Sequence, residues 1–270
     1  MSRLQPVTER AKRAGSKLLI PYLVAGDPDK SHTVNIMHSL VEKGADVIEL
    51  GIPFSDPSSD GPVIQRAVER SLENGTSLND VFEIAVEFRK TDCSTPIVLM
   101  GYLNPLEIMG YDLFVKKALE ASIDGVLIVD MPPLESKELH EKLQKYGIDT
   151  IFLIAPTTKA SRAKAIISKT TGYLYYVSLK GVTGAALTDH ASAAEKLSEL
   201  RELTNLPIVI GFGIKDGQSA KKMAQISDGV VIGSALIEGI SSLSTKEITQ
   251  GLIEKSTELV KSIRYSIDSI

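Results

Sequence analysis

Two carboxylate residues, Glu49 and Asp60, lie in a segment that could carry out acid–base chemistry. Glu49 ends an apolar run that is typical of a buried parallel strand, and Asp60 follows in a loop framed by proline and glycine. Burying a lone ionised carboxylate is costly, so such a group is usually paired, protonated or used. A carboxyl whose pKa is raised by burial suits general acid–base catalysis, and two carboxylates in different surroundings can divide the acid and base roles. The alternative is that Glu49 is a buried ion-pair partner and Asp60 a turn residue.

The bulk composition narrows the classes of function. The chain has 270 residues, of which 43% are hydrophobic, and (β/α)8 barrels often reach this length as one domain. The net charge of −4 is spread along the chain without a basic block, which argues against nucleic acid as a partner. No apolar run approaches the roughly 20 residues that span a membrane. Cys93 is the only cysteine and there is no secretory signal, so we expect a cytoplasmic protein.

The elements that must position the two carboxylates alternate regularly. Eight short apolar runs predict buried strands, with helical patterns between them. The runs are residues 18–24, 46–50, 97–102, 125–130, 150–154, 173–178, 208–211 and 229–233. Extra helices are expected before the first strand, where one would cover the barrel floor, after the second strand and, as one closing helix, at the C-terminus. This pattern predicts a single (β/α)8 TIM barrel domain over residues 1–270.

A doubly wound sheet is the rival fold, and its usual motifs are missing. The first strand ends in Gly26-Asp27-Pro28 rather than in a Gly-x-Gly-x-x-Gly turn. Gly211-Phe212-Gly213 comes late, with Asp216 at the position of the third glycine. There is no Gly-Lys-Ser/Thr phosphate loop either. Eight units without these motifs favour the closed barrel.

Glycines gather at the ends of the last three predicted strands, which is where barrels often bind phosphate. Glycine lets backbone N–H groups approach an anion, and a helix beginning near Ser234 would point its positive end there. The alternative is that these glycines only make tight turns. The candidate phosphate-binding segments are Gly181-Val182-Thr183-Gly184, Gly211-Phe212-Gly213 and Gly233-Ser234, and the family resemblance described below implies Gly184, Gly213, Gly233 and Ser234 within them.

Apolar and aromatic residues at the other strand positions suit a flat aromatic ligand, although barrel interiors contain such side chains in any case. These residues are Tyr22, Met100, Leu127, Leu153, Tyr175, Phe212 and Ile232. The four histidines fall in helices or their approaches, and no metal-ligand spacing is present, so no metal site is expected. Ser178 has no evident histidine partner for a catalytic triad.

Five motifs in this order resemble those of the tryptophan synthase α-subunit family. They are Glu49-Leu50-Gly51-Ile52-Pro53-Phe54-Ser55-Asp56-Pro57, Asp60-Gly61-Pro62-Val63-Ile64-Gln65, Gly101-Tyr102-Leu103-Asn104-Pro105, Gly181-Val182-Thr183-Gly184 and Gly211-Phe212-Gly213-Ile214. The resemblance implies retro-aldol cleavage of indole-3-glycerol phosphate to indole and glyceraldehyde 3-phosphate. It also implies a β subunit as partner in an α2β2 tetramer. No cofactor is expected in this chain, and pyridoxal phosphate is expected only in the β subunit.

The resemblance also implies roles for individual residues. Glu49 would be the acid–base, Asp60 would meet the ring nitrogen, and Tyr175 would be the active-site tyrosine. Thr183 would close over the site and orient Asp60, and Ile64 would join the substrate pocket. The sequence departs from the family pattern at Ser58-Ser59, where Leu-Ala is usual, at Tyr22, usually phenylalanine, and at Met100, usually leucine.

Two other functions stay open on the sequence. One is another phosphate-binding (β/α)8 enzyme, although an epimerase would need histidines at strand ends. The synthase that closes the indole ring would need lysines there, and only Lys180 lies near a strand end. The other is a non-catalytic subunit that regulates a partner, against which the two intact carboxylates argue.

Overall fold

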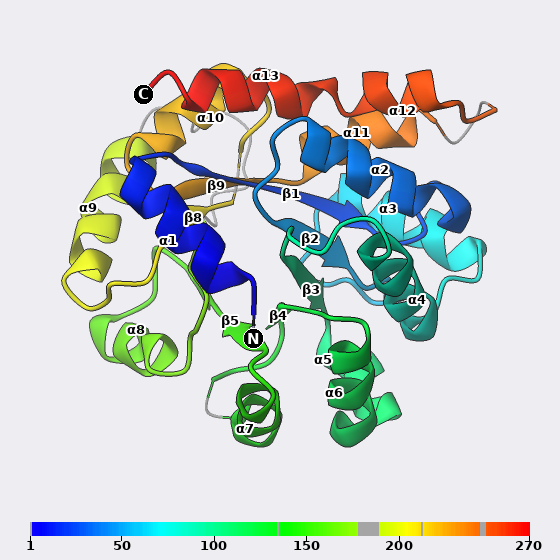
Figure 1. Ribbon diagram of the computed structural model, residues 1–270. Coiled ribbons are helices and arrows are strands. Elements are labelled where there is room, and N and C mark those ends of the chain that lie inside the picture. Colours follow the sequence, from blue (N-terminus) through cyan, green and yellow to red (C-terminus); the bar gives the residue numbers. More distant parts are fainter. Residues whose placement is uncertain (1, 134, 178–188, 212, 244–246) are drawn as a thin grey trace.

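The computed structural model describes residues 2–133, 135–177, 189–211, 213–243 and 247–270. Within these residues the strands form one parallel sheet in the order β5-β4-β3-β2-β1-β9-β8-β7-β6. The strands are β1 Leu18–Val24, β2 Ile48–Gly51, β3 Ile97–Gly101, β4 Gly125–Ile128, β5 Asp149–Ile151, β6 Leu153–Ile154, β7 Leu174–Tyr176, β8 Ile208–Ile210 and β9 Gly229–Ile232. Figure 1 shows helices around the outside of this sheet.

The fifth predicted strand is divided at Phe152, which separates β5 from β6. β5 pairs with β4, and β6 pairs with β7, so the two halves bond to opposite neighbours. The two ends of the strand order are therefore consecutive in the chain, and the sheet forms a nearly closed barrel. The predicted TIM barrel is confirmed, with eight strand positions and one of them split.

The helices occupy the predicted intervals with two differences. They are α1 Leu4–Ala14, α2 Lys30–Glu42, α3 Pro62–Glu73, α4 Leu78–Arg89, α5 Leu103–Met109, α6 Tyr111–Glu120, α7 Lys137–Lys145, α8 Ala160–Ile167, α9 Asp189–Arg201, α10 Gly217–Ala224, α11 Ser234–Ser241, α12 Gln250–Ser256 and α13 Glu258–Ile267. The single closing helix expected at the C-terminus is two helices that meet at Thr257. α5 was not predicted, because Asn104 and Pro105 are typical of a loop; Pro105 lies in the first turn, where a helix tolerates proline.

The barrel floor is closed by α1, which Figure 1 shows lying across one end of the barrel. Leu4 is fully buried, and its Cδ1 lies 3.1 Å from the place a Cβ would take at Gly125 or Gly172. The buried carboxylate of Asp124 accepts hydrogen bonds from Arg3 Nη1 at 3.0 Å and Arg89 Nη2 at 2.8 Å. These contacts fasten the start of α1 to the amino ends of β3 and β4, and the expected floor-covering helix is confirmed.

The sequence places Asp60 through the start of α3. Gly61 precedes the helix in an extended conformation, and Pro62 takes the first helical position, where the missing N–H costs nothing. The loop that carries Asp60 therefore runs directly from the carboxyl end of β2 into α3. None of the helices in the described residues has both the length and the apolar character needed to cross a membrane.

Candidate active site

Glu49 lies in β2 with its side chain entirely buried. Tyr173 Oη donates a hydrogen bond of 2.6 Å to Glu49 Oε1, while Oε2 has no hydrogen-bond partner among the described residues. Burial raises the pKa of Glu49 to about 7, and the hydrogen bond from Tyr173 opposes that rise. A carboxyl that titrates near neutral pH can both give and take a proton. The alternative of a buried ion pair finds no support at Glu49, because no cation contacts it among the residues described.

Tyr173 is a site residue that the sequence did not reveal. It comes directly before β7 and lies two residues before Tyr175, so both side chains point to the same face of the strand. The signal was this spacing of two in the run Tyr173-Leu174-Tyr175-Tyr176. Only the fold shows that the Tyr173 hydroxyl reaches Glu49 on the other side of the barrel.

Asp60 is held in the loop between β2 and α3. Its N–H donates to the Pro57 carbonyl at 3.0 Å, and the Gln65 side-chain amide donates to the Asp60 carbonyl at 2.8 Å. Tyr102 Oη donates to Asp60 Oδ2 at 3.0 Å and accepts from the Ser59 N–H at 3.0 Å. Burial raises the pKa of Asp60, and the Tyr102 hydrogen bond opposes this. Tyr102 at the end of β3 therefore fixes the carboxylate, a role that its sequence position alone did not indicate.

Tyr175 brings the two carboxylates into one site. Its side chain is buried, and a Cβ at Gly211 would overlap its hydroxyl oxygen, so only glycine fits at that position. Burial raises the pKa of the Tyr175 hydroxyl well above its ordinary value, and the charge of Glu49, then Tyr22 and Asp60, raises it further. The hydroxyl therefore stays protonated, within the electrostatic reach of both carboxylates.

A cavity of about 790 Å³ opens beside these residues, a size that suits a small-molecule ligand. Its walls include Asp60, Tyr175, Met100 and Leu153 of the predicted site. Leu127 is fully buried in β4 and pairs in register with Met100. The cavity lies at the carboxyl ends of the strands, where barrel enzymes have their active sites.

Gly213, Gly233 and Ser234, three of the candidate phosphate-binding residues, follow β8 and β9 at the same carboxyl end of the barrel. α11 begins at Ser234, and Gly233 gives it no side-chain cap, which leaves backbone N–H groups at its start for an anion. Gly213 is exposed after β8 with φ of 69°, a conformation that favours glycine. Tyr22 and Ile64 each come within 3.9 Å of a Cβ placed at Gly233. Thr183, Gly184 and Phe212 lie outside the described residues.

The register corrects the prediction for Ile232. Ile232 pairs with Pro21, whereas Val231 pairs with Ile20. A Cβ at Gly233 would face Tyr22, and side chains alternate along a strand, so Val231 shares the interior face with Tyr22. Ile232, fully buried, therefore points outward against the helices, and Val231 is the β9 side chain that faces the barrel interior.

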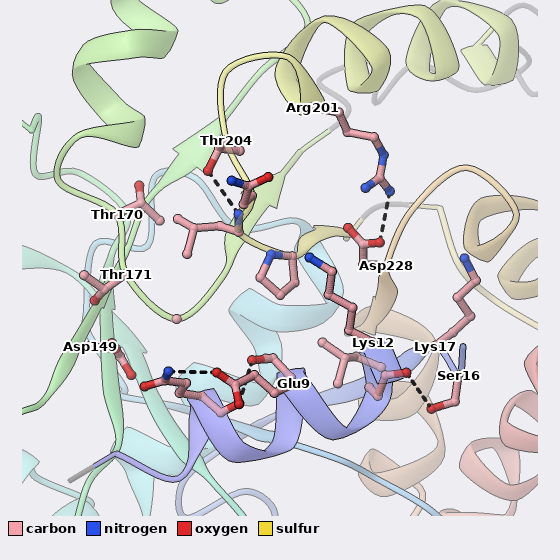
Figure 2. Close-up of a pocket in the computed structure, with 18 of the residues that line it drawn as sticks. Glu9, Lys12, Ser16, Lys17, Asp149, Thr170, Thr171, Arg201, Thr204 and Asp228 are labelled. Carbon is pink, nitrogen blue, oxygen red and sulfur yellow. Dashed lines mark hydrogen bonds and ion pairs between the residues drawn. The ribbon is translucent and has the colours of Figure 1, made fainter. Parts of the chain in front are cut away.

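A second cavity, of about 800 Å³, lies at the opposite end of the barrel beneath α1. Figure 2 shows Lys12, Asp149, Thr204 and Asp228 around it. None of the predicted catalytic residues lines this cavity, and it lies at the amino ends of the strands. Its position therefore excludes it as the reaction site. In the described part of the chain, no group of three or more His, Cys, Asp or Glu residues could hold a metal ion.

Comparisons with known proteins agree on one family. The family model described as "Tryptophan synthase alpha chain" matches residues 8–265. The tryptophan synthase alpha chain of Marinobacter nauticus is 49% identical over 270 residues, covering 100% of this chain and 99% of that one. The protein of that name from Thioalkalivibrio sulfidiphilus is 52% identical over 241 residues, covering 89% and 91%.

Solved structures give the same result. Tryptophan synthase subunit alpha from Legionella pneumophila superposes with a TM-score of 0.92 at 43% identity, covering 100% of both chains. A chain of tryptophan synthase from M. tuberculosis, in an aminoacrylate-bound form, superposes with a TM-score of 0.86 at 29% identity, covering 99% of this chain and 100% of that one.

Proposed function

This chain belongs to the tryptophan synthase alpha chain family, and from this premise we propose how its site performs the family reaction. The protein is a lyase that cleaves indole-3-glycerol phosphate to indole and glyceraldehyde 3-phosphate. The observation that carries the assignment of its site is Glu49, a buried acid with a pKa of about 7, together with the Asp60 carboxylate that Tyr102 holds at the same end of the barrel.

Cleavage of the bond between ring carbon 3 and the side chain needs the indole to become a leaving group. Glu49, in its protonated form, gives a proton to ring carbon 3. Asp60 accepts a hydrogen bond from the ring N–H and stabilises the positive charge that develops on the ring. The side-chain hydroxyl next to the ring then loses its proton to the Glu49 carboxylate, the carbon–carbon bond breaks, and an aldehyde forms. Glu49 ends protonated, so the proton balance closes within one turnover.

The surroundings of Glu49 support both steps. A carboxyl with an ordinary pKa would be almost entirely ionised at neutral pH and a poor acid, whereas burial keeps a large protonated fraction near pH 7. Tyr173 holds one oxygen, which leaves Oε2 as the atom that exchanges the proton. Tyr102 similarly orients the Asp60 carboxylate toward the site.

The phosphate of the substrate is proposed to bind at the start of α11, at Gly233 and Ser234, with Gly213 beside it. Gly184 is proposed for the same cradle and Thr183 for the loop over the site, both on the family resemblance. The aromatic ring would lie against Tyr22, Ile64, Met100, Leu127 and Leu153, together with Phe212. Neither a cofactor nor a metal is needed for the steps above, and the cytoplasm is the proposed location.

Gly213→Val should weaken binding of phosphorylated ligands by at least about tenfold, since charge-assisted hydrogen bonds to the phosphate would be lost. The backbone at Gly213 has a φ of 69°, which a valine would strain, moving N–H groups away from the anion. Binding of indole-3-propanol phosphate and of indole-3-propanol, measured by calorimetry, tests this.

Gly15→Val is the matched control, because Gly15 has φ of 66°, open space around it and a position at the end of α1. It carries similar backbone strain away from the site and should leave both affinities unchanged. Equal losses for the two ligands in Gly213→Val would show that the pocket was distorted and would remove Gly213 from the phosphate site.

The partner is proposed to be a tryptophan synthase β subunit that carries pyridoxal phosphate, assembled with this chain as an α2β2 tetramer. The surface beside the site supports this proposal. Ser55, Asp56, Ser58 and Ser59 are exposed on the loop that carries Asp60. On the neighbouring α5, the Ile108 side chain is 82% exposed and offers an apolar contact that a partner could cover.

The assay that tests the function is indole release from indole-3-glycerol phosphate, with and without a β subunit. We expect slow release by the isolated chain and faster release in the complex, because docking on the 53–60 loop would favour the conformation in which Asp60 meets the ring nitrogen. A coupling of about 1–3 kcal/mol corresponds to roughly 5–150-fold at equilibrium.

Pro57→Ala, titrated with the same β subunit, should need more partner to reach the same rate. A chain equally active alone and with a saturating, verified partner would contradict the coupling, and a chain inactive in both states would contradict the lyase function.

A further inference from the structure

Tyr22 spans the space between the proposed phosphate site and the two carboxylates. Its Cδ1 lies 3.9 Å from the place of a Cβ at Gly233, on β9. Its hydroxyl oxygen lies 2.5 Å from the place of a Cβ at Gly51, two residues after Glu49 on β2. The ring thus has one edge beside the start of α11 and its hydroxyl beside the carboxylates.

The hydroxyl of Tyr22 has no hydrogen-bond partner among the described residues. Tyr102 and Tyr173, the tyrosines nearest to the carboxylates, are engaged with Asp60 and Glu49 at 3.0 and 2.6 Å. The fully enclosed side-chain atoms without a partner include Glu49 Oε2 but not Tyr22 Oη, so the Tyr22 hydroxyl keeps some solvent contact although its side chain is only 6% exposed. A ligand that displaces water from it must supply a partner, because a polar group left unpaired on burial weakens binding.

The hydroxyl is a hydrogen-bond donor in this setting. Burial raises the pKa of Tyr22 well above its ordinary value, and the nearby negative groups raise it further. Those groups are Asp60, Tyr102, Glu49 and Asp27, in decreasing order of effect. Burial and the charges of Glu49 and Asp60 likewise keep Tyr175 neutral. Tyr22 therefore keeps its proton at neutral pH and requires an acceptor.

We propose that Tyr22 is a specificity-determining residue, whose hydroxyl donates a hydrogen bond to a hydroxyl oxygen of the substrate's glyceryl chain. This inference rests on the proposed function and names a contact that the function does not require. The indole N–H can only donate, and the phosphate lies at the opposite edge of the Tyr22 ring. The glyceryl chain joins the indole ring to the phosphate. Its hydroxyl oxygens would therefore lie beside the Tyr22 hydroxyl and can accept its hydrogen bond.

Tyr22→Phe removes the hydroxyl and keeps the ring. Indole-3-glycerol phosphate has the chain hydroxyls, whereas indole-3-propanol phosphate keeps the ring and the phosphate but lacks both hydroxyls. We expect kcat/KM for the glycerol substrate to fall about three- to tenfold, the loss typical of one neutral hydrogen bond. The inhibition constant of the propanol compound should stay unchanged.

Met100→Leu is the matched control, because Met100 lines the cavity beside Asp60 and Tyr175 and has no polar group. It should change the two measurements by the same factor. The inference is overturned if Tyr22→Phe alters neither measurement, or if it alters both equally, since the ring alone would then be what matters. A wild-type protein that releases no indole would instead refute the proposed function, before any variant is compared.

Discussion

Glu49→Gln is expected to lower the turnover of indole formation by at least about 100-fold while the fold is retained. The amide keeps the size of the side chain and can still accept the hydrogen bond from Tyr173. It cannot give a proton to ring carbon 3 or take one from the hydroxyl, and both transfers depend on this group. Steady-state indole release, together with circular dichroism of the folded protein, gives the result.

Asp46→Asn is a suitable control, because Asp46 precedes the same strand at the other end of the barrel. Burial raises the pKa of Asp46 too, yet this carboxylate accepts from the Leu19 N–H and Arg264, far from the cavity mouth. The turnover of Asp46→Asn should stay close to that of the wild type.

Glu49 is protonated below a pKa of about 7 and ionised above it, so wild-type kcat/KM should fall as the pH rises through about 7. More than about a tenth of wild-type turnover in Glu49→Gln would remove Glu49 from the mechanism.

Asp60→Asn is expected to lower kcat by about 10- to 100-fold with a smaller effect on KM. Asparagine can still accept the ring N–H, but it lacks the negative charge that offsets the positive ring. Because that charge appears only as the reaction proceeds, the loss falls on turnover more than on binding.

Tyr102→Phe separates the charge from its positioning. It removes the hydroxyl that holds Asp60 Oδ2 at 3.0 Å but keeps the carboxylate, so its loss of turnover should be smaller than that of Asp60→Asn. Weaker binding with unchanged turnover in Asp60→Asn would assign Asp60 to recognition of the bound substrate instead.

The sequence predicted the barrel because buried parallel strands are almost uniformly apolar, which makes Glu49 conspicuous in β2. The same uniformity conceals which side chains of β9 point into the barrel. All four residues of β9 are buried, so the sequence shows no alternation between an inner and an outer face. The sequence therefore predicts Ile232 at the inner face, where the register places Val231.

Local sequence patterns do not reveal the hydrogen-bond partners of the two carboxylates. Tyr173 is separated from Glu49 by 124 residues and Tyr102 from Asp60 by 42, so each pair exists only once the barrel closes. The break at Phe152 similarly reflects pairing with two different neighbours, which a continuous apolar run does not reveal. Glu49, by contrast, is conspicuous because a carboxylate is unusual in an apolar strand, whereas the roles predicted for Asp60 and Tyr175 rest on the family resemblance.

The Leu4 side chain also has a bearing on the chemistry at the far end of the barrel. Leu4 packs where Gly172 leads into Tyr173, the residue whose hydroxyl holds Glu49. Leu4 and Tyr173 belong to one buried apolar cluster, and apolar surroundings disfavour the ionised form of the Glu49 carboxylate. A helix that never meets the substrate thus helps to set the acidity of the catalytic group. Changes near the amino terminus, including fused tags or trimmed residues, would then move the pH optimum as well as the melting temperature.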